Sequence, residues 1–280
     1  MATLQNGSSG GEVTMLQRAL SLLGYSCTVD GNFGPGTQAA VEQFQTAQGL
    51  TADGVAGPNT WAKLDYLAPQ GMDISHFNTV TWNNLSQHIQ FVFHKYSQGA
   101  TYKDPTFSAN LASIKQKGLL YSAYHFLTFQ DSAQSQIDNF MACWNSVEGP
   151  NALPPVLDVE WQVGSSDANT NQLNSYIAQN KNACIQIIGE WIDAVAAQTG
   201  RTPIIYTARS FWNEYFSGVT QFGDNPLWIP AYQQNPPGLP QGWSSYAIWQ
   251  YSENASIPGV GGGSLDMDIF NGNLDALKAL

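Results

Sequence analysis

Apolar residues along this chain recur at helical spacing up to about residue 70 and at strand spacing beyond it. Residues 13–23 carry apolar side chains three or four positions apart and are followed by Gly24, which predicts an amphipathic helix with a glycine stop. A second helix is predicted around residues 40–44, preceded by Pro35 and Thr37 and ended at Gly49. The first part of the chain is therefore predicted to be a small helical bundle.

An internal repeat accompanies these helices. The pattern Asp-Gly-x-x-Gly-Pro-x-Thr occurs at residues 30–37 and again at residues 53–60, an offset of 23 residues. Each copy has glycines for a tight turn, then a proline, then a threonine that can cap the next helix. The repeat thus predicts two equivalent turns, each leading into a helix.

Beyond residue 70, short β-rich runs alternate with longer helical stretches. Eight strands are predicted, at residues 72–75, 91–96, 119–126, 156–160, 203–207, 227–232, 246–251 and 265–270. Helices are predicted at residues 107–117, 131–147 and 172–199, with Gly118 and Gly200 as stops. The later gaps are shorter and rich in Pro and Gly, so the last strands should lack full helices. This order favours an α/β fold, an incomplete TIM-like (β/α)5β3 barrel with its functional site at the carboxyl ends of the strands.

Composition narrows the function. Charged residues make up only 11% of the chain, and 21 acidic against 10 basic residues leave a net charge of −11. A protein without clustered cations is not suited to nucleic acid or to an anionic membrane surface. Aromatic residues reach 12%, with 9 Trp and 12 Tyr. Rings with a polar edge suit sugars, although most of these residues are expected to belong to the core.

Cysteines, histidines and hydropathy give no sign of a metal, a cofactor or a membrane span. The odd cysteine count favours free buried thiols, although a Cys143–Cys184 bridge stays open. The four histidines form no HExxH or comparable motif. No apolar run is long enough to span a bilayer. Residues 1–10 do not resemble a signal peptide, so we expect synthesis in the cytoplasm and release by other means, or a signal already removed.

Two carboxylates stand two residues apart in one predicted strand. Residues i and i+2 of a strand face the same side, so Asp158 and Glu160 point together while Leu157 and Val159 point away from them. Burying neighbouring carboxylates raises at least one pKa, and glycosidic bond cleavage uses acids with separated pKa values. The alternative is that both acids form structural salt bridges at a wet strand end. The scarcity of Lys and Arg weakens that alternative.

Further acids and several aromatic residues are predicted at the same end of the barrel. Asp73 lies in the first strand and Asp266 in the last, and these strands are neighbours in a closed barrel. Asp268 faces the same side as Asp266, one step further along. The aromatic residues that close β runs there are expected to line a sugar cleft, or else to pack at the barrel rim: Tyr124, Tyr206, Tyr232 and Trp249.

Over essentially all of residues 71–280 the chain resembles the glycoside hydrolase family 25 lysozymes, which are N-acetylmuramidases. The matching segments are residues 71–76, 94–95, 101–107, 123–126, 153–160, 203–207, 227–232, 248–252 and 265–268. The resemblance implies four catalytic acids: Glu160 as proton donor, with Asp158, Asp73 and Asp266. Lys95, in the matching pair at 94–95, is expected to bind substrate. The departures from the family pattern are at Asn78, Tyr96, Gln98 and Asp268, and none of them removes a catalytic acid.

Residues 7–66 resemble the three-helix peptidoglycan-binding domains. The matches fall at 13–20, 23–25, 30–34, 40–45, 49–50 and 60–61. The resemblance implies a non-catalytic anchor on bacterial cell wall. We therefore expect a small all-α peptidoglycan-binding domain at residues 1–66, a linker at 67–70 and a catalytic barrel at 71–280.

Together the two resemblances imply hydrolysis of the β-1,4 bond between N-acetylmuramic acid and N-acetylglucosamine in peptidoglycan. We expect a monomer that needs no cofactor and whose partners are peptidoglycan glycan strands. A binding domain placed first is similar to a phage endolysin. An exported bacterial autolysin and a non-catalytic wall-binding protein are the alternatives, the last being disfavoured by the intact set of acids.

The spacing of the two acids also predicts a stereochemical course. Side chains that rise from the same face of one strand cannot easily flank a glycosidic bond from opposite sides. We therefore expect retention by substrate assistance, with Asp158 orienting the reacting N-acetyl group. Direct inversion with Asp73 or Asp266 as base stays open.

Overall fold

Eight strands close into a barrel in the computed structural model, which describes residues 3–280. In order around the barrel they are β1 (Gln70–Ile74), β3 (Ile89–Gln98), β5 (Leu120–Phe126), β6 (Val156–Asp158), β7 (Ile204–Tyr206), β8 (Leu227–Pro230), β9 (Ile248–Ala255) and β11 (Leu265–Phe270). Neighbouring strands from β1 through β9 pair in parallel, whereas β11 runs antiparallel to both β9 and β1. The predicted eight-stranded barrel is confirmed.

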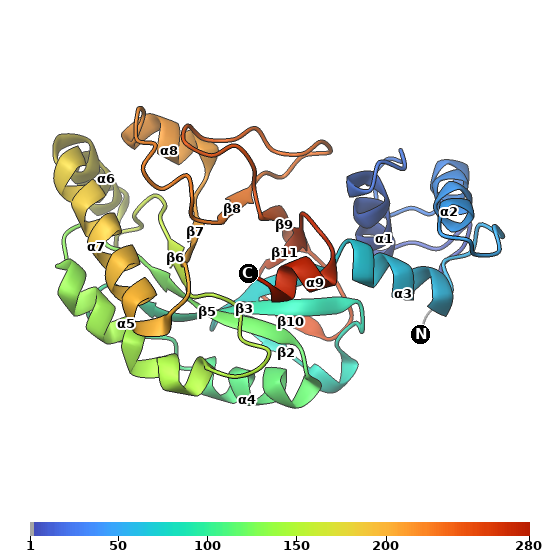
Figure 1. Ribbon diagram of the computed structural model, residues 1–280, viewed down its shortest axis with the longest axis horizontal. Helices are drawn as coiled ribbons and strands as arrows, with labels where there is room; N and C mark the ends of the chain where they lie inside the picture. Colours follow the sequence, from blue (N-terminus) through green and yellow to red (C-terminus); the bar gives the residue numbers. More distant parts are fainter. Residues whose placement is uncertain (1–2) are drawn as a thin grey trace.

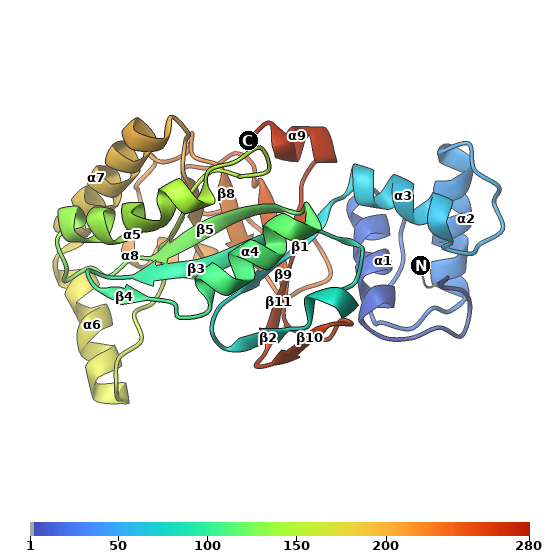
Figure 2. The ribbon, with the colours of Figure 1, turned by 90° about the horizontal axis from the view of Figure 1, so that it is seen from below.

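Helices cover the outside of the barrel between its early strands (Figures 1 and 2). They are α4 (Phe107–Lys117), α5 (Ala133–Val147), α6 (Asp167–Gln179), α7 (Lys181–Thr199) and α8 (Arg209–Tyr215), with the short α9 (Leu274–Lys278) following the last strand. In the described chain no helix lies between β8 and β9 or between β9 and β11, as the short gaps predicted. Within residues 3–280, no helix is long and apolar enough to cross a bilayer.

Two parts of the structure differ from the prediction. The single helix expected at residues 172–199 is wrong: α6 and α7 meet at Asn180, whose φ of −123° is not helical and whose side-chain amide donates to the Tyr176 carbonyl. Outside the predicted strands, β10 (Val260–Gly262) also forms and pairs with β2 (Asn78–Val80). Gly262 has a φ of 96°, and a Cβ there would lie 2.6 Å from the Phe77 carbonyl oxygen, so this pairing requires glycine.

Three helices form the N-terminal module: α1 (Gly11–Leu22), α2 (Pro35–Ala47) and α3 (Pro58–Leu67). A buried glutamine holds the first repeat turn. The Gln17 Nε2 donates to Asp30 Oδ1 at 2.9 Å and to Thr37 Oγ1 at 3.0 Å, while its Oε1 accepts from the Gly31 amide at 2.8 Å. The sequence suggested that Thr37 caps α2. In the structure Thr37 makes no cap and is instead a buried partner of Gln17.

The second repeat turn is built in the same way. Gln45 Nε2 donates to Asp53 Oδ1 at 2.8 Å and to Thr60 Oγ1 at 3.0 Å, and its Oε1 accepts from the Gly54 amide at 3.0 Å. Both glutamines are buried, so each turn is fixed by side-chain bonds that are shielded from water. The sequence repeat therefore corresponds to two turns, each held by the same set of glutamine hydrogen bonds.

The module packs directly against the barrel, on the side of α9 and β9 (Figures 1 and 2). Arg18 of α1 is 4% exposed, and its guanidinium donates to the backbone carbonyls of Gln234 at 2.8 Å and Gln233 at 3.0 Å. The same group lies over the rings of Trp249 and Tyr251, 4.3 and 5.0 Å from their centroids. This buried cation joins one domain to the other.

Further contacts, made by α3, extend the interface. The ring of Trp61 stacks on His88 with centroids 3.7 Å apart, and the Tyr66 hydroxyl donates to Asp275 Oδ2 at 2.8 Å. Between α3 and β1 only Ala68 and Pro69 connect the domains, where a linker over 67–70 was expected. The module is therefore held against the barrel by many contacts along its length.

All three cysteines are free thiols, so Cys143 and Cys184, whose pairing the sequence left open, do not form a disulfide. Burial raises the pKa of the Cys184 thiol to about 11, which keeps it protonated and unreactive.

Candidate active site

A ring of polar and aromatic side chains lines a cavity of about 100 Å³ at the carboxyl ends of the parallel strands. The lining residues are Asp73, Tyr124, Asp158, Glu160, Tyr206, Trp228, Gln250 and Asp266. Apart from Glu160, each comes from a different barrel strand. The antiparallel β11 presents the start of its run at this end, which is why Asp266 pairs with Asp73 of β1. The four predicted acids are thus brought together in one cavity.

Strand alternation places Asp158 and Glu160 side by side, as the sequence predicted. Leu157 and Val159 are fully buried in the core outside the barrel, while Val156 packs inside it. Asp158 is the last residue of β6, so Glu160 lies just beyond the strand rather than within it. Asp158 is 6% exposed, and its Oδ1 is buried with no hydrogen-bond partner. That oxygen is free to accept a donor from a ligand.

Burial raises the pKa of several of these acids. The pKa of Glu160 is raised to about 7 by desolvation, with repulsion from Asp266 adding to it and Lys95 opposing it. Desolvation and then repulsion from Glu160 raise the pKa of Asp158 well above its usual range. The pKa of Asp266 is raised to about 7, by desolvation and by the charge of Glu253. The cluster therefore holds protons at neutral pH, as a proton donor requires.

Asp73 is held by an amide that the sequence analysis did not single out. Gln250 Nε2 donates to Asp73 Oδ2 at 2.8 Å, and Gln250 Oε1 accepts from the hydroxyls of Tyr206 at 3.0 Å and Tyr232 at 2.9 Å. The predicted Tyr206 and Tyr232 therefore reach the site together. Gln250 was visible in the sequence only as an amide within an otherwise apolar run, facing the same side of its strand as Ile248.

Below this ring lies a second buried pair. Trp228 Nε1 donates to Asp268 Oδ1 at 2.7 Å, and its ring meets that of Tyr206 edge-on at 4.7 Å. Asp268 is fully buried, its Oδ2 has no partner, and desolvation raises the pKa of its carboxyl well above its usual range. A buried carboxyl beneath the site thus fixes the Trp228 ring, which lines the cavity.

Lys95 and Tyr124 complete the surroundings of the acids. The Lys95 ammonium donates to Gln98 Oε1 at 2.7 Å and lies 4.8 Å from the centroid of the Phe126 ring. Desolvation lowers the pKa of Lys95, whereas Asp158 and Glu160 raise it. Lys95 acts electrostatically on the acids from outside the cavity lining, while Tyr124 lies in the lining itself.

Trp249 does not join this site. It is 1% exposed, its Nε1 donates to the Ala231 carbonyl at 2.7 Å, and its ring lies under Arg18 of the module. Successive residues of a strand face opposite sides, so Trp249 faces outward because its neighbour Gln250 faces the cavity. Its place is the interface between the two domains.

The acids are not arranged as metal ligands. Within residues 3–280, no three His, Cys, Asp or Glu side chains are grouped so that they could hold a metal ion.

Comparison with known proteins agrees with this geometry. The sequence pattern of Glycosyl hydrolases family 25 matches residues 72–260, and that of a peptidoglycan binding domain matches residues 9–64. Lysozyme M1 of Streptomyces globisporus is 29% identical over 259 residues, covering 88% of this chain and 82% of that protein. An N,O-diacetylmuramidase of Chalaropsis sp is 29% identical over 220 residues, covering 75% of this chain and 98% of that protein.

The fold has solved relatives as well. A family GH25 lysozyme from Aspergillus fumigatus superposes with a TM-score of 0.64 at 28% identity, covering 76% of this chain and 98% of that one. The chain therefore belongs to glycosyl hydrolases family 25. It is a lysozyme that carries a peptidoglycan-binding domain at its N-terminal side.

Proposed function

We propose that the protein hydrolyses the β-1,4 bond between N-acetylmuramic acid and N-acetylglucosamine in peptidoglycan. The observation that carries the proposal is the pair formed by Glu160 and Asp158, a buried acid that is half protonated near pH 7 beside a carboxylate oxygen with no partner. The names of the relatives, a lysozyme and N,O-diacetylmuramidases, support muramic acid as the sugar whose bond is cut.

In the proposed first step, Glu160 donates its proton to the glycosidic oxygen as the bond to the anomeric carbon breaks. The carbonyl oxygen of the sugar's own 2-acetamido group bonds to that carbon and forms an oxazolinium intermediate. Asp158 accepts a hydrogen bond from the acetamido N–H through its free Oδ1 and stabilises the positive charge.

In the second step, water attacks the anomeric carbon and the oxazolinium C–O bond breaks. Glu160, now a carboxylate, takes the proton of that water and is ready for another cycle. Two displacements at one carbon give retention of configuration. Asp73, held by Gln250, and Asp266 complete the polar ring around the reacting sugar.

The experiment follows purified cell walls by turbidity and identifies the new reducing ends. Reducing N-acetylmuramic acid is expected; reducing N-acetylglucosamine would assign a glucosaminidase, and no new ends would leave only wall binding. Proton NMR of the anomeric position during early turnover tests the stereochemistry. A first product with the configuration opposite to that of the cleaved bond would assign inversion, with Asp73 or Asp266 as the base.

We further propose that the protein acts as a phage-type endolysin, because a binding module placed before the barrel resembles the order in endolysins of phages that infect Gram-negative hosts. An exported autolysin is the alternative role. Expressing the protein inside a susceptible cell, with and without a pore-forming protein, separates the two. Lysis that depends on the pore supports the endolysin, and lysis without any pore supports an autolysin that reaches the wall by export.

A further inference from the structure

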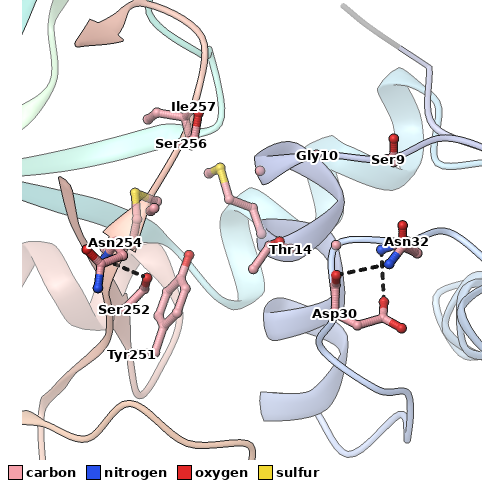
Figure 3. Close-up of a pocket in the computed structure, with 15 residues that line it drawn as sticks. Ser9, Gly10, Thr14, Asp30, Asn32, Tyr251, Ser252, Asn254, Ser256 and Ile257 are labelled. Carbon is pink, nitrogen blue, oxygen red and sulfur yellow. Dashed lines mark hydrogen bonds between the residues drawn. The ribbon is translucent and has the colours of Figure 1, made fainter. Parts of the chain in front are cut away.

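A second cavity lies between the module and the barrel (Figure 3). Its volume is about 410 Å³, four times that of the cavity between the acids. One wall comes from the start of α1 and the first repeat turn of the module. The other wall comes from the end of β9 and the segment that follows it in the barrel. Neither domain forms this cavity alone.

The cavity is a fixed feature because the two domains are locked together around it. Beside it, Arg18 binds the barrel through two carbonyls and two aromatic rings. At its edge, a Cβ on Gly11 would lie 1.8 Å from the Ser256 carbonyl oxygen, so the two backbones touch there. Gln70 also donates to the Met15 carbonyl at 2.9 Å. The walls are therefore held at a set separation.

The lining suits a neutral polyhydroxylated ligand. Hydroxyl and amide side chains line the space on both sides, from Thr14 and Asn32 on the module and from Ser252, Asn254 and Ser256 on the barrel (Figure 3). Met15, Ile257 and Met267 supply an apolar surface of the kind that accepts an acetyl methyl group. Hydrogen-bonding groups around an apolar patch are the features that recognise an N-acetylated sugar.

Charge argues against an anionic ligand. The lining contains no Lys, Arg or His, and its one acid is Asp30. Hydrogen bonds from the Asn32 amide and from Gln17 lower the pKa of Asp30, so it remains ionised. A peptide stem or an unsubstituted muramic acid brings carboxylates that Asp30 would repel, whereas N-acetylglucosamine is neutral.

The position of the cavity relates it to the glycan that is cut. Ser252 and Asn254 line the cavity, and between them the charge of Glu253 acts on Asp266 and Tyr232 of the active site. Asp266 of β11 lines the active site and its neighbour Met267 lines the interdomain cavity, so the β9 and β11 part of the barrel wall separates the two sites. A glycan bound across the acids reaches the interdomain cavity by crossing the barrel rim formed by β9 and β11.

We propose that the cavity between the module and the barrel is a second saccharide site, which binds an N-acetylglucosamine unit of the glycan strand being cleaved. The proposal rests on the function proposed above. It gives the module a role beyond anchoring, because its first repeat turn forms half of a site that positions the substrate chain.

The test uses the full-length Glu160→Gln variant and chitopentaose, a soluble β-1,4 oligomer of N-acetylglucosamine, followed by amide NMR. We expect saturable shifts at Gly10, Gly31 and Asn254. Ser256→Trp, which fills the cavity from an exposed position, should remove these shifts, and Ser217→Trp, an exposed serine after α8, should keep them. Asn254→Ala, which shortens an exposed side chain and removes its hydrogen bond from Ser264, is the second variant and should weaken binding about three- to tenfold.

In the otherwise native enzyme, Ser256→Trp should lower kcat/KM on long glycan strands about three- to tenfold and leave cleavage of short oligomers unchanged. Unshifted cavity amides at saturating oligomer, or equal loss on short and long substrates, would overturn the proposal. If the Ser256→Trp and Asn254→Ala enzymes cut walls at the native rate, the second site is overturned and the proposed function stands. Walls that the unmodified protein does not cut would overturn the proposed function.

Discussion

The side-chain amide of Gln250 joins Asp73 to two tyrosines, donating to Asp73 Oδ2 at 2.8 Å while accepting from Tyr206 and Tyr232. An amide oriented by two hydroxyls has no freedom to flip, so its N–H stays directed at Asp73. The Asp73 carboxyl on β1 is thus held from β9, the strand on the far side of β11.

Replacing Gln250 by leucine keeps the size of the side chain and removes both functions of the amide. We expect kcat on soluble glycan to fall about tenfold with a smaller change in KM, because Asp73 and both tyrosines lose a buried partner. Gln116→Leu, an exposed change on α4, is the matched control. Unchanged kcat in the Gln250 variant would show that Asp73 needs no such support.

Glu160→Gln should abolish lysis while leaving the fold and wall binding intact. Loss of a positioned proton donor lowers the rate by about 10²–10⁴-fold. Turbidity loss measures the activity, and co-sedimentation with insoluble wall measures binding. Glu190→Gln on α7 serves as the control. Clearing of walls by the Glu160 variant at near the native rate would mean that another acid donates the proton.

The pH dependence should report Glu160. Since the pKa of its carboxyl is raised to about 7, the protonated donor is present below that pH, and kcat/KM should fall as pH rises through 7. Lys95 opposes this shift, so Lys95→Met should move the falling limb to higher pH whatever it does to the maximum rate. If the falling limb of the pH profile lies at the same pH in the Lys95→Met variant, the titrating group is not near Lys95.

Stability should also depend on pH through these acids. The folded pKa of Asp266 is about 7, above its unfolded value of 3.8, so its favourable contribution is complete below about pH 4 and is lost as pH rises through 7. Asp266→Asn removes the ionisation and should stabilise the protein at pH 8, by on the order of 2 kcal/mol, but not at pH 4. Urea unfolding at the two pH values measures the difference. An equal effect at both would contradict the assignment.

Arg18 should matter for catalysis although it belongs to the binding module. It holds the carbonyls of Gln233 and Gln234, next to Tyr232, whose hydroxyl reaches Gln250. We expect Arg18→Ala to lower kcat/KM on short soluble oligomers about three- to tenfold, where wall anchoring plays no part. Arg201→Ala, a cation remote from the module, is the control. Full activity of the Arg18 variant on these oligomers would confine the module to anchoring.

Much of the fold follows from local patterns in the sequence. A β-rich run marks the strand at residues 156–158, and the alternation of side chains along a strand predicts that Asp158 and Glu160 lie side by side. The position of Asp266 opposite Asp73 follows from barrel closure, which makes the first and last strands neighbours. These inferences need only spacing and topology.

The predictions that failed concern features that the local sequence pattern does not determine. Trp249 and Gln250 are adjacent, and a single step along a strand decides which of them faces the cavity and which faces the module. Arg18 looks like any polar residue of an amphipathic helix until a second domain covers it. Gln17 and Thr37 give no hint of pairing because their contact depends on how a turn folds back over α1.

The two-residue connection at Ala68 and Pro69 has a kinetic consequence. A catalytic domain on a long linker can reach many bonds while its binding domain stays attached to the wall. In this protein the barrel and the module move together, so the barrel reaches only the bonds near the attachment point. Each attachment therefore presents the barrel to a single stretch of glycan, and the next cut waits for release and rebinding. At saturating substrate, the rate of lysis is then set by the rate at which the module dissociates from the wall. A mutation that raises the affinity of the module for the wall would therefore slow the enzyme.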